Sequence, residues 1–228
     1  MSGPGRRMDE IPQPDAYRDE RLLMVEEQLR ARGIRDERVL DAMARVPRHE
    51  FVPPEHRGEA YEDHPLPIGE GQTISQPFVV AAMLEALALR REDVALEVGT
   101  GSGYETAVLA ELVGTVYSIE RIASLAERAR AVLARLAYGN VTVVHGDGSQ
   151  GLPDAAPFDA IVVSAAAPQV PASLMGQLRD GGRLVIPVGS GFAQELQLVR
   201  KIGGNSTTMY LDGVRFVPLI GREGFHIE

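Results

Sequence analysis

The sequence contains no cysteine and has more acidic than basic residues. The absence of cysteine excludes disulfides, thiolate nucleophiles and thiolate metal ligands. A formal net charge of −9 disfavours nucleic acids as partners, because their binding depends on basic surfaces that displace phosphate counterions. The longest apolar stretch, Phe78 to Leu89, is interrupted by Glu85 and is too short to span a bilayer. We therefore expect neither a nucleic-acid nor a membrane partner.

The amino terminus and the histidines indicate whether a signal peptide or a metal site is to be expected. The basic residues in MSGPGRR are not followed by an apolar segment, so no signal peptide is expected. A cytoplasmic protein in a reducing compartment agrees with the lack of cysteine, and a monomer is the default expectation. The five histidines (His49, His56, His64, His145 and His226) form no obvious cluster, so no metal site is predicted.

The length of 228 residues suits one α/β domain with a modest N-terminal addition. Residues 1–16 are rich in Gly, Pro and charge, which predicts a flexible tail. We expect residues 17–228 to form a single domain. Within it, residues 17–77 supply N-terminal helices and a segment that covers the substrate and cofactor, and residues 78–228 form a Rossmann-like core.

Two helices are predicted at the start of this domain. Leu22, Val25 and Leu29 form an apolar stripe at helical spacing, and Gly33 is a typical stop. Asp36 is a suitable N-cap for the second helix. The following stretch contains six prolines over residues 47–77 and few periodic signals, which is typical of a long functional or disordered loop.

The rest of the chain alternates between short apolar runs and helical stretches. The predicted strands are VALEV, TVYSIE, VTVVHG, FDAIVVSAA and RLVIPVG, and the helices are Tyr104–Val113, Arg121–Ala137 and PASLMGQLRDGG. This alternation predicts a three-layer, doubly wound α/β fold with a mostly parallel sheet. ELQLVRKI and TTMYLDGVRFVPLI, joined by a Gly/Asn/Ser turn, predict an antiparallel C-terminal hairpin.

A glycine-rich turn follows the first of these strands. It reads Glu97-x-Gly99-x-Gly101-x-Gly103 and opens a helix. The spacing excludes the dinucleotide fingerprint G-x-G-x-x-G, since the sixth position from Gly99 is Tyr104, and no phosphate loop is present. The turn resembles the cofactor loop of class I S-adenosylmethionine methyltransferases, where glycines allow the backbone to approach a ligand closely. Taken alone, it could also be a tight connection.

Two further signals follow the next two strands. Glu120 ends the second strand, where a carboxylate can accept hydrogen bonds from ribose hydroxyls. Asp147 and Gly148 follow the third strand, where the aspartate can accept from an adenine amino group and the glycine leaves room for the base. Each acid alone is better explained as a solvated strand-end charge. Three signals at three successive strand ends favour a cofactor site.

The segment before Pro77 predicts a second part of the site. Proline suits a first helical turn, so Ser75 and Gln76 fall at or beside a helix cap. Free backbone N–H groups and a hydroxyl at a helix start can bind an anion. The alternative is that Ser75 is only a structural cap, and helix chemistry alone favours that alternative.

A family resemblance favours a functional role for Ser75 over that of a structural cap. The stretches VPRHEFVP, PLPIG-x-GQTISQP, LEVGTGSGY, VYSIER, HGDG-x-x-G, PFDAIVVSAA, GGRLVIPVG and VRFVPL occur in this order. From about Met24 to about Gly221 the chain resembles the protein-L-isoaspartate O-methyltransferase family, and GQTISQP and VRFVPL are quite specific to it. The resemblance implies a seven-stranded class I methyltransferase core that transfers a methyl group from S-adenosylmethionine to isoaspartyl residues of damaged proteins, leaving S-adenosylhomocysteine.

The resemblance also implies roles for particular residues. Ser75 becomes the active-site serine, with Gln76 as a substrate-binding candidate and Arg215 as a weaker one, since a surface strand charge is the better explanation of Arg215. The residues expected at the cofactor are Gln72, Thr73, Ile74, Ser75, Glu97, Gly99, Gly101, Gly103, Glu120, Asp147 and Gly148. Two positions depart from the family pattern: Glu105 stands where bacterial members often have a neutral residue, and Ile220 where threonine is common.

The expected reaction needs little from the protein beyond alignment. An α-carboxyl group has a pKa of about 3.5, so the acceptor is already ionised and no general base is needed. We therefore assign Ser75 to positioning the substrate carboxylate. Two rivals remain open: a class I methyltransferase for a small molecule or another carboxylate acceptor, and a non-catalytic binding module of the same fold. A nicotinamide dehydrogenase is disfavoured by the missing glycine.

Overall fold

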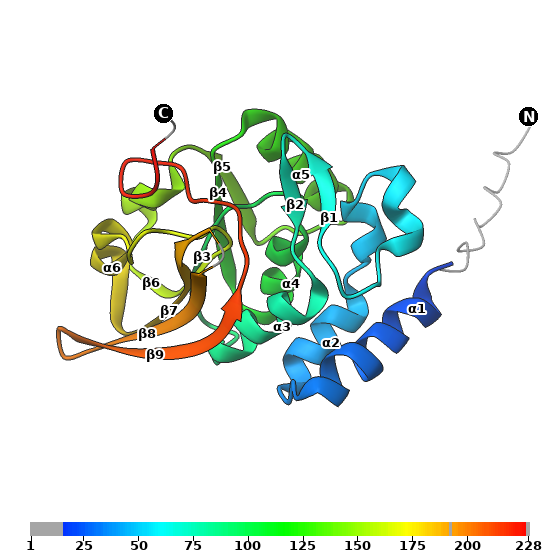
Figure 1. Ribbon diagram of the computed structural model, residues 1–228, viewed down its shortest axis with the longest axis horizontal. Helices are drawn as coiled ribbons and strands as arrows, with labels where there is room; N and C mark the ends of the chain where they lie inside the picture. The colour runs from blue at the N-terminus through cyan, green and yellow to red at the C-terminus, as the bar shows by residue number, and fades with distance from the viewer. Residues whose placement is uncertain (1–15, 192, 227–228) are drawn as a thin grey trace, which may run out of the picture.

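The computed structural model describes residues 16–191 and 193–226, and its main element is a seven-stranded sheet in the order β5-β4-β3-β6-β7-β8-β9 (Figure 1). The strands are β3 (Val94–Val98), β4 (Thr115–Glu120), β5 (Val141–His145), β6 (Phe158–Val163), β7 (Leu178–Ser190), β8 (Ala193–Ile202) and β9 (Asn205–Val214). The tail predicted over residues 1–16 lies, except for Ala16, outside the described residues.

The predicted mixture of strand directions is confirmed. β3 pairs in parallel with β4 and β6, β4 with β5, and β6 with β7. β8 pairs antiparallel with β7 and β9, which forms the predicted C-terminal hairpin. The chain adds strands on one side of β3 as far as β5 and then crosses to β6 on the other side. β3 and β6 therefore border the point where the strand order reverses, where ligands of open α/β sheets bind.

Helices cover the two faces of the sheet unequally. α3 (Pro77–Ala86), α4 (Tyr104–Leu112) and α5 (Ala123–Arg135) pack on one face, whereas the short α6 (Ala172–Gln177) and loops cover the other. Successive strand residues point to opposite faces, so Ala95 lies in the first core and Leu96 in the second. Both are almost fully buried, in agreement with the apolar runs of the sequence.

The first predicted helix is longer and less regular than its apolar stripe indicates. α1 (Arg18–Leu23) continues through a π-helical turn, Met24–Leu29, and a 3₁₀ turn, Arg30–Arg32, before Gly33 ends it with φ +109°. Leu22, the first residue of the apolar stripe, is 38% exposed. Wider π-helical turns alter the spacing of the buried face, which contains Met24, Val25 and Leu29. α2 (Glu37–Arg45) begins at Asp36 as predicted, and the Asp36 side chain accepts from the Arg38 N–H.

The proline-rich stretch contains structure that was not predicted. 3₁₀ turns occupy Arg48–Phe51 and Pro54–Glu59, and β1 (Leu66–Gly69) pairs antiparallel with β2 (Gln72–Ile74). The β1–β2 hairpin lies over the glycine-rich turn: a Cβ on Gly101 would be 3.4 Å from Ile68 Cδ1. The sequence signal for this hairpin was the Gly-Glu-Gly turn between two short segments.

The predicted helix PASLMGQLRDGG is shorter than expected. α6 ends at Gln177, and β7 begins at Leu178, which pairs with Phe158. The register then shifts, so that Ala160 pairs with Arg183. Tertiary contacts override the helical pattern here, because the Gln177 side chain accepts a hydrogen bond from Leu152 N and donates one to the Gln150 carbonyl. None of the described helices is long and apolar enough to cross a bilayer.

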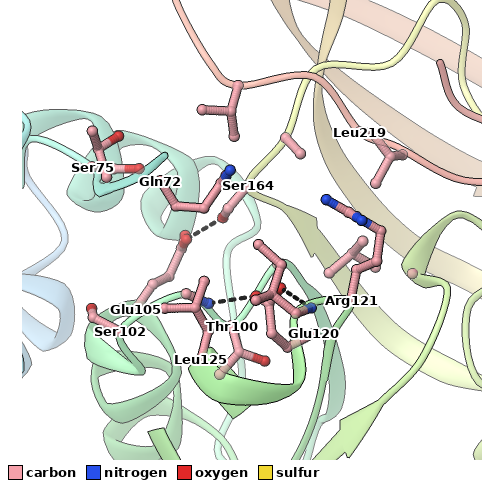
Figure 2. Close-up of a pocket in the computed structure, with 18 of the residues that line it drawn as sticks. Gln72, Ser75, Thr100, Ser102, Glu105, Glu120, Arg121, Leu125, Ser164 and Leu219 are labelled. Atoms are coloured by element: carbon pink, nitrogen blue, oxygen red, sulfur yellow. Dashed lines mark hydrogen bonds between the residues drawn. The ribbon is translucent and has the colours of Figure 1, made fainter. Parts of the chain in front are cut away.

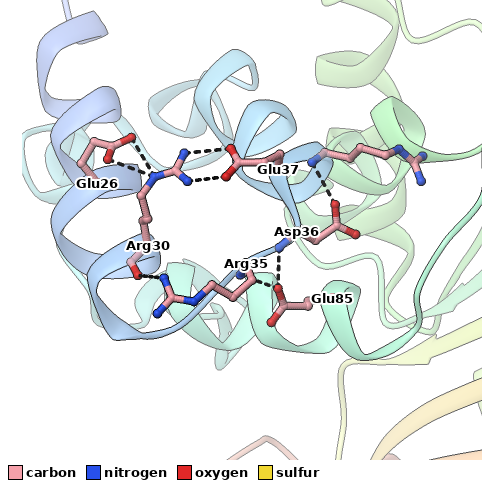
Figure 3. Close-up of polar contacts among 7 residues, drawn as sticks. Glu26, Arg30, Arg35, Asp36, Glu37 and Glu85 are labelled. Carbon is pink, nitrogen blue, oxygen red and sulfur yellow. Dashed lines mark hydrogen bonds and ion pairs between the residues drawn. The ribbon is translucent and has the colours of Figure 1, made fainter.

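A carboxylate on α3 holds the start of α2. Glu85 Oε1 accepts hydrogen bonds from the backbone N–H groups of Arg35, at 2.6 Å, and Asp36, at 2.7 Å (Figure 3). Nearby, Arg30 bridges Glu26 and Glu37 on the exposed surface. The Glu85 contacts join two elements, whereas the Arg30 network is open to solvent and should be screened by salt.

We expect Glu85→Ala to lower the free energy of unfolding by about 1–2 kcal/mol, because two backbone donors lose a charged acceptor. The matched control, Arg30→Ala, should have a smaller effect that shrinks further at high salt. Urea unfolding of both variants at low and high salt measures the difference. Equal destabilisation by the two substitutions would contradict this assignment.

Candidate functional site

A cavity opens at the carboxyl edge of the parallel strands. Segments that are distant in the sequence line it, because parallel strands bring their carboxyl ends to one edge. The residues around it are Gln72–Ser75, Val80, Val98–Ser102, Tyr104, Glu105, Ile119–Ile122, Leu125, Gly148, Ser164, Ala165 and Val217–Ile220.

The glycine-rich turn forms one wall of this cavity. Gly99, Gly101 and Gly103 have φ values of +97°, +53° and +89°, which residues with a Cβ rarely adopt. Gly99 and Gly101 line the cavity, whereas Gly103 precedes α4 and packs against α5, where a Cβ would lie 3.3 Å from Ala129 Cβ. Gly103 thus supports the wall without contacting the cavity.

Glu120 lies at the end of β4 and holds the wall in place. Its Oε2 accepts from Gly101 N, and its Oε1 accepts from Ile122 N, each at 2.9 Å (Figure 2). A carboxylate has about four lone-pair sites, so each oxygen keeps the capacity to accept another hydrogen bond. The side chain is 6% exposed and lines the cavity. It can therefore shape the turn and also accept from hydroxyl groups of a ligand.

Asp147 and Gly148 follow β5, and only the glycine lines the cavity. Asp147 accepts hydrogen bonds from Ser149 N, Ser149 Oγ, Gln150 Nε2 and Arg222 N. Burial, the largest effect, raises the pKa of Asp147, but hydrogen bonds from Arg222 N, Ser149 and Gln150 outweigh it and lower the pKa below its ordinary value. Asp147 therefore ties the C-terminal segment to this strand end, beside Gly148.

Glu97 lies behind the glycine-rich turn. Its side chain is fully buried, and Oε2 accepts hydrogen bonds from Thr106 Oγ1 and Ser118 Oγ, both at 2.5 Å. Burial and the neighbouring charge of Glu105 raise its pKa well above the ordinary value. The structure places Glu97 against α4 and β4, outside the cavity lining, so its contribution to this site is to support the turn.

Ser75 joins the cavity to a second pocket. It follows β2, lines both spaces, and its hydroxyl makes no hydrogen bond within the described part of the chain. Its carbonyl accepts from Arg48 Nη2 at 2.8 Å, and the fully buried Arg48 also donates to the Ala60 carbonyl and stacks over the Tyr104 ring. The side chain that accepts from the first turn of α3 is Asp63, whose Oδ1 accepts from Phe78 N at 2.9 Å, and Gln76 makes no cap bond of its own. This disfavours the alternative of Ser75 as a structural cap.

The second pocket contains the predicted substrate-binding residues. Gln76 and Arg215 both line it, together with Thr73, Ser75 and Ser164. Among the residues that the structure describes, Arg215 is the one charged residue of this lining, which suits an anionic ligand. Gln194 fixes the neighbouring backbone, since its side chain accepts from Phe216 N at 2.7 Å and donates to Phe216 O at 3.1 Å.

Three important residues were not predicted as site residues. Ser164 follows β6, and its hydroxyl donates a hydrogen bond to Glu105 (Figure 2). The signal for Ser164 was its position as the first polar residue after an apolar strand, at the same sheet edge as Glu120. Glu105 had been noted only as a departure from the family. Arg48 gave no signal, because arginine is rarely buried and a buried one is recognised only from its partners.

No group of three or more metal-binding side chains occurs among residues 16–191 and 193–226. The arrangement instead offers two joined pockets. One has glycine backbone, Glu120 and Gly148 for a ligand with hydroxyl and aromatic parts, and the other has Ser75 and Arg215 for an anion. Because Ser75 lines both pockets, the arrangement suits a reaction between two ligands that meet beside this residue.

Comparisons with known proteins point to the same chemistry. The sequence model of the family Protein-L-isoaspartate(D-aspartate) O-methyltransferase matches residues 19–224. A Protein-L-isoaspartate O-methyltransferase of Methanoculleus marisnigri is 56% identical over 214 residues, covering 94% of this chain and 97% of its own. One from a Roseiflexus species is 57% identical over 212 residues, covering 93% of this chain and 97% of its own.

A solved structure extends the comparison to three dimensions. The isoaspartate methyltransferase of Plasmodium falciparum, in complex with S-adenosyl-L-homocysteine, superimposes with a TM-score of 0.78 at 29% sequence identity. The match covers 88% of this chain and 98% of the Plasmodium chain.

We expect Gly148→Ala to narrow the cavity and lower stability. A Cβ at this position would lie 2.5 Å from Val98 Cγ1, so the buried strand residue must move, at a cost of about 1–3 kcal/mol. The matched control is Gly146→Ala, whose Cβ would lie 3.3 Å from the flexible end of Ile119. Chemical unfolding and calorimetric titration with S-adenosylhomocysteine measure both effects. Wild-type stability and affinity in Gly148→Ala would refute this explanation.

Proposed function

The chain belongs to the protein-L-isoaspartate O-methyltransferase family, and we propose that its two joined pockets divide the reaction between cofactor and damaged protein. The enzyme transfers a methyl group from S-adenosylmethionine to the free α-carboxylate of L-isoaspartyl residues. The products are the methyl ester and S-adenosylhomocysteine. The observation that carries the assignment of the pockets is the position of Ser75, which borders both.

The residues of the cavity at the strand ends fit the cofactor. Glu120 offers carboxylate oxygens for ribose hydroxyls, and the buried Gly148 leaves room beside Val98 that a Cβ would fill. Gly99 and Gly101 present backbone without side chains. When bound, the cofactor supplies an electrophilic methyl group on a sulfonium. We assign Gln72, Thr73, Ile74 and Ser75 to covering it, and Asp147 to holding the loop beside the adenine position.

The second pocket would receive the substrate. The α-carboxylate is ionised at neutral pH, because its pKa is about 3.5, so no residue has to remove a proton. Arg215 provides positive charge near the entrance, and the Ser75 hydroxyl is available to donate a hydrogen bond to the carboxylate. Holding the two reactants in line can supply about 7–11 kcal/mol of the rate enhancement.

Arg48 keeps Ser75 in place for this task. It spans from the Ala60 carbonyl to the Ser75 carbonyl and also stacks over Tyr104, so its guanidinium joins the N-terminal segment, the start of α3 and α4. Burial, as the largest effect, lowers its pKa, partly offset by the nearby tyrosines. We class Arg48 as a positioning residue, since it touches the Ser75 backbone and not the proposed substrate site.

The proposed working context follows from the sequence. An acidic chain without cysteine fits a monomeric enzyme of the cytoplasm, with no nucleic-acid or membrane partner. We propose that residues 17–228 act as one domain, in which residues 17–77 cover the site formed by residues 78–228. Sedimentation of the purified protein tests the monomeric state, and fractionation of cells that produce it tests the cytoplasmic location.

The substrate assignment is tested with radiolabelled S-adenosylmethionine and two peptides that differ only in an aspartyl or L-isoaspartyl linkage. We expect methylation of the isoaspartyl peptide and none of the aspartyl peptide, because only the former presents a free α-carboxylate in the branch. Equal labelling of both peptides would favour the alternative of a class I enzyme for another carboxylate acceptor. Absence of labelling despite cofactor binding would favour a binding module.

We expect Ser75→Ala to lower kcat on the isoaspartyl peptide by about tenfold or more, the effect of losing one hydrogen bond to a charged group. Cofactor affinity should remain within about twofold of wild type, because Glu120 and the glycine turn are intact. Steady-state kinetics and cofactor titration separate the two effects. Loss of cofactor binding with unchanged turnover at saturation would move Ser75 to the cofactor site.

A further inference from the structure

The strand order determines which way the cofactor extends. Gly148 follows β5 and Glu120 ends β4, so adenine and ribose occupy that side of the cavity under the proposed function. The next strands across the sheet are β3 and β6. The amino-acid portion of the cofactor must therefore extend over the ends of these strands. Glu105 and Ser164 lie there, and Figure 2 shows them on the side of the cavity nearer Ser75.

Glu105 has an unusual environment for a carboxylate. Its side chain lies in α4, lines the cavity and is only 8% exposed. One oxygen, Oε2, accepts a hydrogen bond from Ser164 Oγ. The other, Oε1, is buried and has no hydrogen-bond partner in the described part of the chain. Leaving a buried charged acceptor without a partner is costly, so such an atom calls for an explanation.

We propose that the carboxylate of Glu105 binds the α-ammonium group of the amino-acid portion of S-adenosylmethionine. This inference rests on the proposed function and concerns a position where the sequence departs from the pattern expected of the family. An ammonium has three N–H donors and a full positive charge, which matches an acceptor that is charged and lacks a partner. The sulfonium is a poorer match, because it has no hydrogen to donate.

The surrounding charges support a cationic partner. Among the described residues, Glu105, Glu120 and Arg121 are the charged side chains of the lining, and Glu97 lies behind the wall, where the charge of Glu105 acts on it. The lining segments Gln72–Ser75, Ser164–Ala165 and Val217–Ile220 carry no charge. Burial, the dominant effect, raises the pKa of Glu105 to about 7, against the opposing effect of the Ser164 hydrogen bond. The free protein thus holds a proton on this group at mildly acidic pH.

A pH dependence of binding follows from this arrangement. The ammonium pairs with ionised Glu105, so binding lowers the pKa of this carboxyl group and releases its proton. Below pH 7 the empty site is mostly protonated, and affinity should fall as pH falls, approaching tenfold per unit. Above pH 7 the group is already ionised and this dependence should disappear. Measurements below pH 7 also keep the cofactor amino group protonated, since α-amino groups titrate near about 7.7–8.0.

The decisive variant is Glu105→Gln, which preserves size and removes the charge. At pH 7.5 we expect the Kd values for S-adenosylmethionine and S-adenosylhomocysteine both to rise about tenfold, because both ligands carry the ammonium. The Kd for 5′-methylthioadenosine, which has no amino-acid portion, should not change. Glu127→Gln, at an exposed position on α5, is the control and should bind all three ligands as wild type.

Calorimetry of S-adenosylhomocysteine binding in two buffers with different ionisation enthalpies gives the number of protons released. At pH 6 we expect close to one proton from the wild type and none from Glu105→Gln. Equal affinity in the two proteins, or equal proton release, would overturn the inference. Weakening for S-adenosylmethionine alone would also overturn it, since that result assigns Glu105 to the sulfonium.

These outcomes are distinct from failure of the proposed function. If wild type binds neither S-adenosylmethionine nor S-adenosylhomocysteine, the cofactor site itself is wrongly assigned and the inference falls with it. If wild type binds both and methylates the isoaspartyl peptide while Glu105→Gln behaves identically, only the role of Glu105 is rejected. Circular dichroism and thermal unfolding of the variant confirm that any loss of binding occurs in a folded protein.

Discussion

The parallel pairing of β3 with both β4 and β6 is the constraint on which the site depends. It brings the turns after these strands to one edge, so that Gly99, Glu120 and Ser164 surround one cavity although they are far apart in the sequence. The reversal of strand order between β3 and β6 leaves room for a ligand at this edge. Hydrogen bonds from Gly101 N and Ile122 N to Glu120 then join the glycine turn to the neighbouring strand end.

The β1–β2 hairpin covers part of the sheet edge. It lies over the glycine turn and contacts α5, where Ser124 Oγ donates to Glu70 Oε1 at 2.8 Å. Buried Arg48 donates to the carbonyl of Ser75, the residue that lines both the proposed cofactor cavity and the proposed substrate pocket. The rigid sheet and the covering segment therefore meet at the residue proposed to align the two reactants. This division explains how one core can be combined with an acceptor site specific to the family.

The acidic residues around the cavity have different physical tasks. Glu97 is fully buried and hydrogen-bonded behind the turn, Glu120 holds backbone N–H groups, and Glu105 faces the cavity. Glu105 and Glu120 thus present carboxylates to the cavity, whereas Glu97 supports its wall from behind.

The sequence by itself determined the alternation of strands and helices, the antiparallel C-terminal hairpin, the glycine turn and the choice of family. These depend on local signals: apolar runs, turn residues and motifs with definite spacing. Only the tertiary structure decided that Leu22 is exposed, that α6 ends at Gln177, and that Glu97 and Gly103 support the cavity from behind. It also revealed Arg48 and the Glu105–Ser164 contact. The physical reason is that burial and hydrogen-bond partners arise between segments distant in the chain, and a local pattern carries no record of them.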